Sequence, residues 1–260
     1  QKNKRIIFTE GDDDIAYLKA MNEAFKRVNS PLAIDFSKIS FWYIRGKDNM
    51  NLKIMANKQL LSQAVQGCKY AVIFDKDYST EAANTKFINS DILRRLGNSS
   101  WAHTHNGYCI ESVLFSEMDK LKKFLNKITG KDEETINTFL DEYFYELKQS
   151  LSNVQSNIYF NMKEKFKSQK KPTRPELDNV EFDIYAGEAA QNIHYAMNKD
   201  NIRAFVLKIE EEWGITLFQR EDDASETFAS GLLNKYIDSI EAADDIYNDY
   251  AILFQKIRDF

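Results

Sequence analysis

The sequence contains little proline, glycine and cysteine. Three prolines and 9 glycines among 260 residues are too few for the many tight turns of an all-β fold, so long helices are expected. The two cysteines, Cys68 and Cys109, are too few and too isolated for a disulfide framework or a cysteine zinc site. We therefore expect a reduced, cytoplasmic protein.

Further absences narrow the class of protein. No stretch approaches the ~18 apolar residues of a membrane span, and residues 1–5 lead into a strand without a signal-peptide core, so no membrane association is expected. No phosphate-binding loop of the G-x-x-x-x-G-K-[ST] type is present, so the chain should not hydrolyse ATP alone. The net charge of −5 argues against a DNA-coating protein but not against a nuclease, because metal-binding carboxylates themselves add negative charge.

The first half of the chain alternates predicted strands and helices. Strands are predicted at residues 5–9, 39–44, 70–74 and 101–104, with a weaker extended segment at 33–36, and helices at 12–29, 50–66 and 87–96. Short apolar runs that end in turn residues are typical of buried parallel strands. The pattern predicts an α/β domain with a mainly parallel sheet and flanking helices over residues 1–115.

The second half, residues 116–260, is predicted to form a mainly α-helical domain. Helical periodicity extends over residues 116–128, 132–170, 200–213, 225–240 and 242–260. The sequence has no internal repeat or low-complexity linker, so the boundary near residue 115 rests on this change of pattern.

Three acidic sites stand out, and the first two directly follow predicted strands. The sites are Glu10-Gly11-Asp12-Asp13-Asp14, Asp75-Lys76-Asp77, and Glu111 within residues 106–112. Because sites in open α/β sheets form at the carboxyl ends of strands, carboxylates from neighbouring strands can converge there. Hard oxygen ligands suit Mg²⁺, or Mn²⁺ in its place. The predicted metal ligands are Glu10, Asp14, Asp75 and Asp77.

Phosphodiester cleavage is the chemistry that such a site fits. One or two Mg²⁺ ions can activate the nucleophile and stabilise the leaving oxygen. The predicted catalytic residues are Glu10, Asp75, Lys76, Asp77 and Glu111. Asp14, one turn into its helix, would support the site or order the loop of Gly11, and Gly11 would allow close approach of a phosphate. Lys76, Arg45 and Lys47 would hold that phosphate.

Each motif also has a simpler interpretation. Acidic residues at a helix start commonly cap the helix, and Asp-x-Asp commonly forms a turn. Glu111 is equally typical of a surface or helix-start carboxylate. The order of the first two motifs on two strands favours the metal site over capping and turns alone.

Nucleic-acid contacts are predicted at local basic positions. These are Arg45, Lys47, Lys163, Lys167, Lys170 and Lys171, the last four in a lysine-rich segment interleaved with Phe160 and Phe166. A solvated helix end is the alternative for that segment. The cluster Tyr143-Phe144-Tyr145 is more typical of helical core than of a base-stacking surface.

The three histidines, His103, His105 and His194, are not spaced as metal ligands in the sequence. His103 and His105 lie near the third acidic site, where one of them could donate a proton.

The acidic motifs carry a family resemblance. Glu10-Gly11-x-x-Asp14 after a strand, followed by Asp75-x-Asp77 after a later strand, resembles the TOPRIM domain of topoisomerases, primases and OLD-type nucleases. The spacing between these two motifs and the intervening Gly46-Lys47 turn are most similar to OLD-like TOPRIM proteins, in which Glu111 would match a third acidic position. The resemblance covers residues 5–115.

With its helical second half, the chain is also similar to the TOPRIM subunit of PARIS-type anti-phage defence systems. That resemblance implies a TOPRIM-like (Rossmann-like) fold and a toxic, Mg²⁺-dependent endonuclease that attacks RNA, including transfer RNA, ahead of DNA. It implies control by a separate ATPase subunit and is compatible with a homodimer. Two alternatives remain: a topoisomerase-like nicking enzyme, and a non-catalytic TOPRIM-fold subunit that only binds partners.

Overall fold

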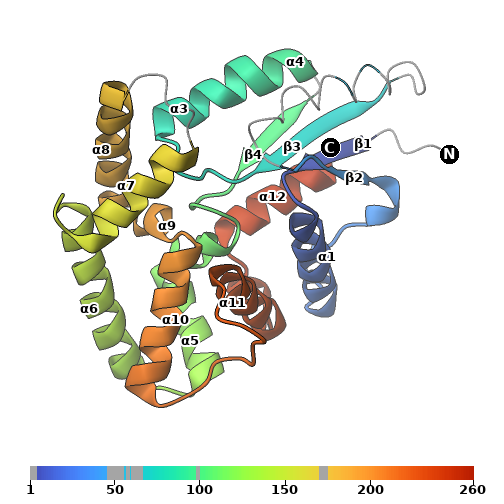
Figure 1. Cartoon of the computed structure of the whole chain (residues 1–260). Helices are drawn as coiled ribbons and strands as arrows, with labels where there is room; N and C mark the ends of the chain where they lie inside the picture. Colours follow the sequence, from blue (N-terminus) through green and yellow to red (C-terminus); the bar gives the residue numbers. More distant parts are fainter. Residues whose placement is uncertain (1–4, 46–55, 57–58, 60–66, 98–99, 170–174) are drawn as a thin grey trace. The chain divides into compact units, whose positions relative to one another are not determined.

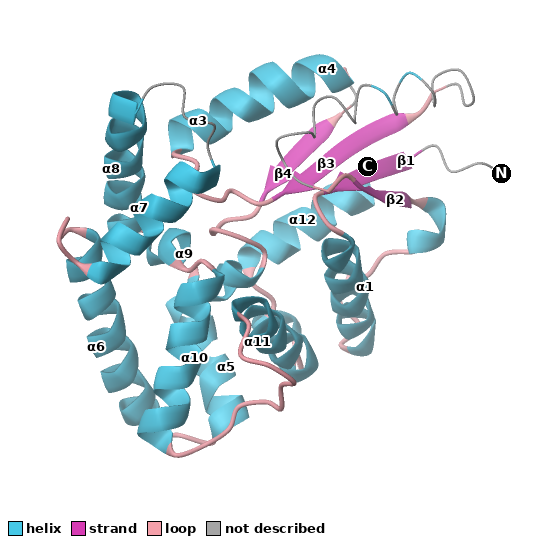
Figure 2. Cartoon of the chain, viewed as in Figure 1, coloured by secondary structure: helices cyan, strands magenta, loops and turns pink. Residues whose placement is uncertain are grey.

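The computed structural model describes residues 5–45, 56, 59, 67–97, 100–169 and 175–260. The chain forms two compact units. The sheet unit contains residues 1–75, 82–105 and 240–260, and the helical unit contains residues 76–81 and 106–239. Figure 1 labels the elements along the chain, and Figure 2 distinguishes helices from strands.

The sheet unit is built on four parallel strands. They are β1 (Arg5–Thr9), β2 (Ser40–Tyr43), β3 (Lys69–Phe74) and β4 (Trp101–Thr104), in the order β2-β1-β3-β4. The registers pair Ile6 with Ser40 and Tyr70, and Ala71 with Trp101. The predicted α/β class, the parallel sheet and all four main strands are therefore confirmed. Residues 33–36 form no strand; a short 3₁₀ helix, η1 (Phe36–Lys38), follows instead.

Burial of side chains on both faces explains why β1 and β3 lie in the centre of the sheet. One face of the sheet carries a buried cluster made of Ile6, Phe8, Ile44, Tyr70, Val72, Phe74, Ile92 and Leu96. Ile7, Ala71 and Ile73, between them in sequence, are also buried. Strands buried on both faces read as continuous apolar runs, as residues 6–8 and 70–74 do.

Helices of several lengths complete the sheet unit. They are α1 (Asp12–Arg27), the nearly continuous run of α3 (Glu81–Lys86), the π-helical segment η3 (Phe87–Leu93) and α4 (Arg94–Leu96), then η5 (Ala243–Asp245) and α12 (Asn248–Asp259). The helix predicted at 87–96 thus begins earlier, at Glu81. The helix predicted at 50–66 falls almost wholly outside the described residues.

The helical unit contains one short 3₁₀ helix and seven α-helices among its described residues. They are η4 (Glu111–Phe115), α5 (Met118–Thr129), α6 (Glu133–Leu151), α7 (Asn157–Gln169), α8 (Pro175–Gln191), α9 (Ile193–Ala196), α10 (Lys199–Trp213) and α11 (Ser225–Ser239). Helix α8 was not predicted, and its exposed Val180 and Ile184 blur the amphipathic pattern.

The single helix predicted at 132–170 is two helices, α6 and α7. In the break, the Asn153 side chain accepts a hydrogen bond from the Gln155 N–H at 3.0 Å, and Ser156 Oγ accepts one from the Tyr159 N–H at 3.0 Å. Short polar side chains that bond nearby backbone compete with helix formation, which explains the interruption.

The compact units do not follow the predicted division at residue 115. Residues 106–115 belong to the helical unit, and residues 240–260 return to the sheet unit. Aromatic contacts hold residues 240–260 against the rest of the sheet unit. The ring centroid of Phe254 lies 4.5 Å from that of Phe25 on α1, and the ring centroid of Phe260 lies 5.5 Å from that of Trp101 on β4. Hydrophobic periodicity identifies α12 as a helix but carries no information about this partner.

None of the helices in the described ranges combines the length and the apolar composition needed to cross a membrane.

Candidate active site

The carboxyl ends of the two central strands bring Glu10 and Asp75 together. Glu10 follows β1 and Asp75 follows β3, and the two strands are paired up to Phe8 and Val72. The Asp75 backbone N–H donates a long hydrogen bond, 3.3 Å, to Glu10 Oε2. Both residues are half-buried, so they remain accessible to solvent. This contact joins the Glu10 carboxylate to the backbone of Asp75, and the convergence of the two carboxylates stays a prediction.

Hydrogen bonds order the loop between β1 and α1. The buried Thr9 donates from Oγ1 to the Gly11 carbonyl at 2.8 Å, and the Gly11 N–H donates to Asp14 Oδ2 at 2.9 Å. Asp14 therefore caps α1 and holds the loop, as one predicted role required. Its role as a metal ligand stays a prediction.

Gly11 is not required by the fold of this loop. Its backbone is extended, with φ −125° and ψ 169°, a region that any residue adopts. An added Cβ would lie 3.8 Å from Asp14 Oδ2 and 3.9 Å from the Asp13 nitrogen, which are ordinary contacts. A Cβ at this position would therefore fit without a clash.

Arg45 lies beside Glu10 through its backbone. Its N–H donates to the Glu10 carbonyl at 2.9 Å, and its left-handed φ of 55° turns the chain after β2. The guanidinium carbon lies 5.7 Å from the centre of the Tyr43 ring, and the residue is exposed. Arg45 therefore places a cation on the same edge of the sheet as Glu10. Lys47 lies outside the described residues.

Lys76 is buried within the helical unit. Its ammonium lies 2.6 Å from Glu81 Oε1 and 3.3 Å from the centre of the Tyr195 ring. Burial acts to raise the pKa of Glu81, but hydrogen bonds from Lys76 and Tyr195 and the charge of Lys76 outweigh it and lower that pKa. To hold a phosphate, as predicted, Lys76 would have to leave Glu81.

Asp77 forms a turn next to the third acidic segment. It has a left-handed φ of 53°, and its N–H donates to the Tyr108 carbonyl at 2.8 Å. Burial, followed by the charge of Asp77, raises the pKa of the Tyr108 phenol. The turn interpretation of Asp75-x-Asp77 is thus correct for Asp77, and its role as a metal ligand stays a prediction.

Glu111 is the first residue of η4 and is 3% exposed. It is therefore a helix-start carboxylate, and the alternative of a surface carboxylate is wrong. The segment before it is tightly folded: a Cβ on Gly107 would lie 2.4 Å from Ser112 Oγ and 3.1 Å from the Val113 nitrogen. Ser112 Oγ in turn accepts from the Cys109 N–H at 2.8 Å.

The described lysines of the basic segment lie near carboxylates. Lys163 Nζ is 3.8 Å from Asp183, and Lys167 Nζ is 2.9 Å from Glu164. These contacts favour the solvated, ion-paired helix over a groove for nucleic acid. Lys170 and Lys171 lie outside the described residues.

The tyrosine cluster of α6 belongs mainly to the helical core. Ring centroids of Tyr143 and Phe144 lie 5.2 Å and 6.2 Å from that of Phe205 on α10, whereas Tyr145 is exposed. The core interpretation is confirmed for Tyr143 and Phe144.

Sequence reasoning missed a cluster of His103, His105 and Asp249. Their potential ligand atoms lie within 4.8 Å of one another, and all three residues are buried. His103 and His105, two apart at the end of a strand, project to the same side, and this spacing was the available signal. Asp249 lies far beyond His105 in the chain, on a helix whose partner the sequence does not reveal.

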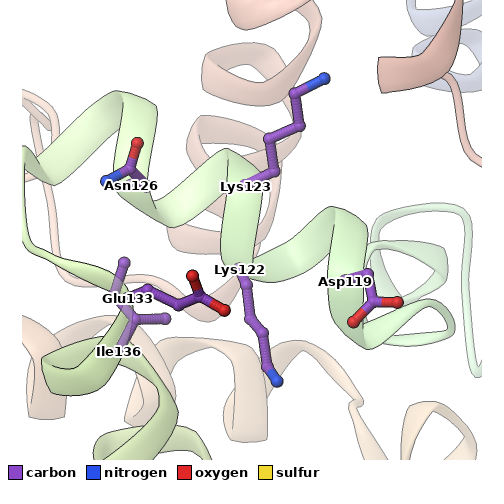
Figure 3. A pocket seen from close by; sticks show the side chains of 6 residues that line it. All are labelled: Asp119, Lys122, Lys123, Asn126, Glu133 and Ile136. Atoms are coloured by element: carbon purple, nitrogen blue, oxygen red, sulfur yellow. The ribbon is translucent and has the colours of Figure 1, made fainter.

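The helical unit also contains a surface groove between α5 and the start of α6 (Figure 3). Its lining residues are Asp119, Lys122, Lys123, Asn126, Glu133 and Ile136. The mixed charges favour neither an anion nor a cation, and none of the predicted site residues lies there.

Comparisons with protein-family models, with curated proteins and with solved structures give no match to this chain. Functional inference therefore rests on the geometry of the site and on the motifs themselves.

Proposed function

We propose that the chain is a Mg²⁺-dependent endonuclease whose metal site lies at the carboxyl ends of β1 and β3. The observation that carries the proposal is the pairing of Glu10 with Asp75 across two adjacent central strands. Both residues are half-buried acids that follow adjacent central strands, and a divalent ion at this edge of the sheet would offset their negative charge.

The donor set fits Mg²⁺. Carboxylate oxygens from Glu10 and Asp75 are hard ligands, and the remaining positions around Mg²⁺ are usually filled by water and substrate phosphate. A bound Mg²⁺ would supply charge to activate water and to stabilise the leaving oxygen. Gly11 is proposed to allow the backbone to approach a phosphate closely, and Arg45 offers a guanidinium on the same edge.

The substrate and its regulation form the part of the proposal that rests on the TOPRIM resemblance. RNA, including transfer RNA, is proposed ahead of DNA, and the chain is proposed to be a toxic, cytoplasmic effector of anti-phage defence. Because the sequence lacks a phosphate-binding loop, control by ATP would require the separate ATPase subunit that the resemblance implies.

The test is cleavage of end-labelled total RNA and of supercoiled plasmid DNA with Mg²⁺. Wild type is compared with Glu10→Ala and Asp75→Ala, and with Asp13→Asn as a control, since Asp13 is an exposed carboxylate in the first turn of α1, close to Glu10 in sequence. Cleavage by wild type and the control, lost in the other two variants and abolished by chelator, supports a metal nuclease. If wild type cuts neither polymer, the isolated chain is not a nuclease.

A non-catalytic binding subunit is the second candidate. The engagement of Lys76 with Glu81 and Tyr195 favours it, because this lysine is not presented to a phosphate as the structure stands. Metal binding without cleavage, unchanged by Lys76→Met, would support this candidate over the enzyme.

A further inference from the structure

A second cluster of potential metal ligands lies in the sheet unit, away from Glu10 in sequence. His103 is in β4, His105 directly follows this strand, and Asp249 lies in the first turn of α12. Their exposed fractions are 4%, 2% and 8%. The cluster joins two segments that are distant in the sequence.

Nitrogens of both imidazoles lie close to the Asp249 carboxylate. His103 Nε2 lies 3.3 Å and 3.4 Å from the two oxygens of Asp249, and His105 Nδ1 lies 3.5 Å from Asp249 Oδ2. Zinc bonds of about 2.0–2.1 Å at tetrahedral angles place neighbouring ligand atoms about 3.3–3.4 Å apart.

His105 gives an independent reason to expect a ligand. Both of its ring nitrogens are buried without a hydrogen-bond partner, including Nδ1, whose approach to Asp249 does not meet hydrogen-bond geometry. Buried polar atoms are nearly always satisfied, so an orphaned imidazole in a core needs an explanation. A metal ion bound by a ring nitrogen would supply the missing partner.

We propose that His103, His105 and Asp249 bind one Zn²⁺ ion that ties β4 to α12. Two imidazoles and one carboxylate are a donor set that suits zinc and disfavours Mg²⁺, which prefers oxygen ligands alone. A water molecule would take the fourth position. The ion would link β4 to α12, two segments that are distant in the sequence. The proposal does not depend on the nuclease activity.

The test uses the full chain, freed of metal by chelator and then titrated with Co²⁺ as a probe for Zn²⁺. Wild type is expected to bind one equivalent in this site with the intense visible absorption of tetrahedral Co²⁺, and Zn²⁺ should displace it. His105→Gln and Asp249→Asn should weaken binding at least tenfold, since even changes to outer-shell groups cost about 10–100-fold. His194→Gln, a histidine of the helical unit, should bind as wild type does.

Folding and metal binding are separated by two further measurements. Circular dichroism checks each variant, and the thermal midpoint of wild type should rise with Zn²⁺ and not with Mg²⁺. Absence of tetrahedral Co²⁺ absorption in folded wild type, or equal binding by wild type and folded His105→Gln, would overturn the proposal. Glu10→Ala should keep the site, so failure of the nuclease proposal would be distinguishable from failure of this one.

Discussion

Replacing Glu10 by glutamine separates the chemistry of the candidate active site from its structure. The amide oxygen of the new side chain can still accept the hydrogen bond that the Asp75 N–H makes over 3.3 Å, while the negative charge is removed. The free energy of unfolding should therefore change by no more than about 0.5 kcal/mol. Glu10→Ala also removes the acceptor and should cost about 1 kcal/mol, the usual net value of a hydrogen bond.

The expected effect on cleavage is much larger. A preorganised group that stabilises developing charge contributes about 10²–10³ in rate, or roughly 3–4 kcal/mol of activation free energy. Glu10→Gln should thus lose at least about 100-fold in Mg²⁺-dependent cleavage although its stability is nearly unchanged. Urea denaturation gives the stability, and initial rates over a Mg²⁺ titration give the activity. Cleavage by Glu10→Gln within tenfold of wild type would refute the assignment of Glu10.

Three other changes test separate parts of the account. Gly11→Val should leave the urea midpoint nearly unchanged, because its Cβ meets only ordinary contacts. It should raise KM for a nucleic acid by at least about tenfold, and equal KM values for variant and wild type would contradict the proposed approach of phosphate to Gly11. Gly107→Ala should destabilise the chain by about 1–3 kcal/mol, since its Cβ would lie 3.1 Å from the backbone of Ser112; a neutral effect in thermal unfolding would contradict that close approach. In wild type, Arg220 donates two hydrogen bonds of 2.8 Å to the carboxylate of Glu210, which is little exposed. Arg220→Met leaves this carboxylate without its partner and should lower the free energy of unfolding by about 2–4 kcal/mol. The hydrogen bond from Arg220 lowers the pKa of Glu210, so the stabilisation that this ion pair gives the fold is fully present above the unfolded-state pKa of about 4.3. This stabilisation is lost as the pH falls through the lower folded-state pKa. Arg220→Met should flatten this part of the curve of stability against pH, and an unchanged curve would show that the pair does not contribute.

Much of the sheet unit could be predicted from local pattern. Apolar runs ended by Glu10 and Asp75 gave the central strands almost to the residue, because strands buried on both faces leave little choice of side chain. The order β2-β1-β3-β4, which places β3 beside β1, was not predicted.

Other features depend on contacts that a local pattern does not encode. The return of α12 to the sheet rests on Phe254 and Phe260, whose partners, Phe25 and Trp101, lie in the first half of the chain. The same return brings Asp249 to the two histidines after β4, which is why the histidine cluster was missed. The break between α6 and α7 depends on small polar side chains that bond nearby backbone, a weak signal within a strongly helical pattern.

The most direct test of the central claim is to locate the bound metal. Fe²⁺ bound in place of Mg²⁺, with ascorbate and peroxide, generates radicals that cut the backbone close to the ion. The account predicts fragments that end near residues 10–11 and 75, suppressed by excess Mg²⁺ and absent from Asp75→Asn. Cuts near residues 103–105 and 249 would report the second site and should be suppressed by Zn²⁺. If no cuts appear near Glu10 and Asp75, or if Asp75→Asn does not change them, the metal centre at the strand ends is contradicted.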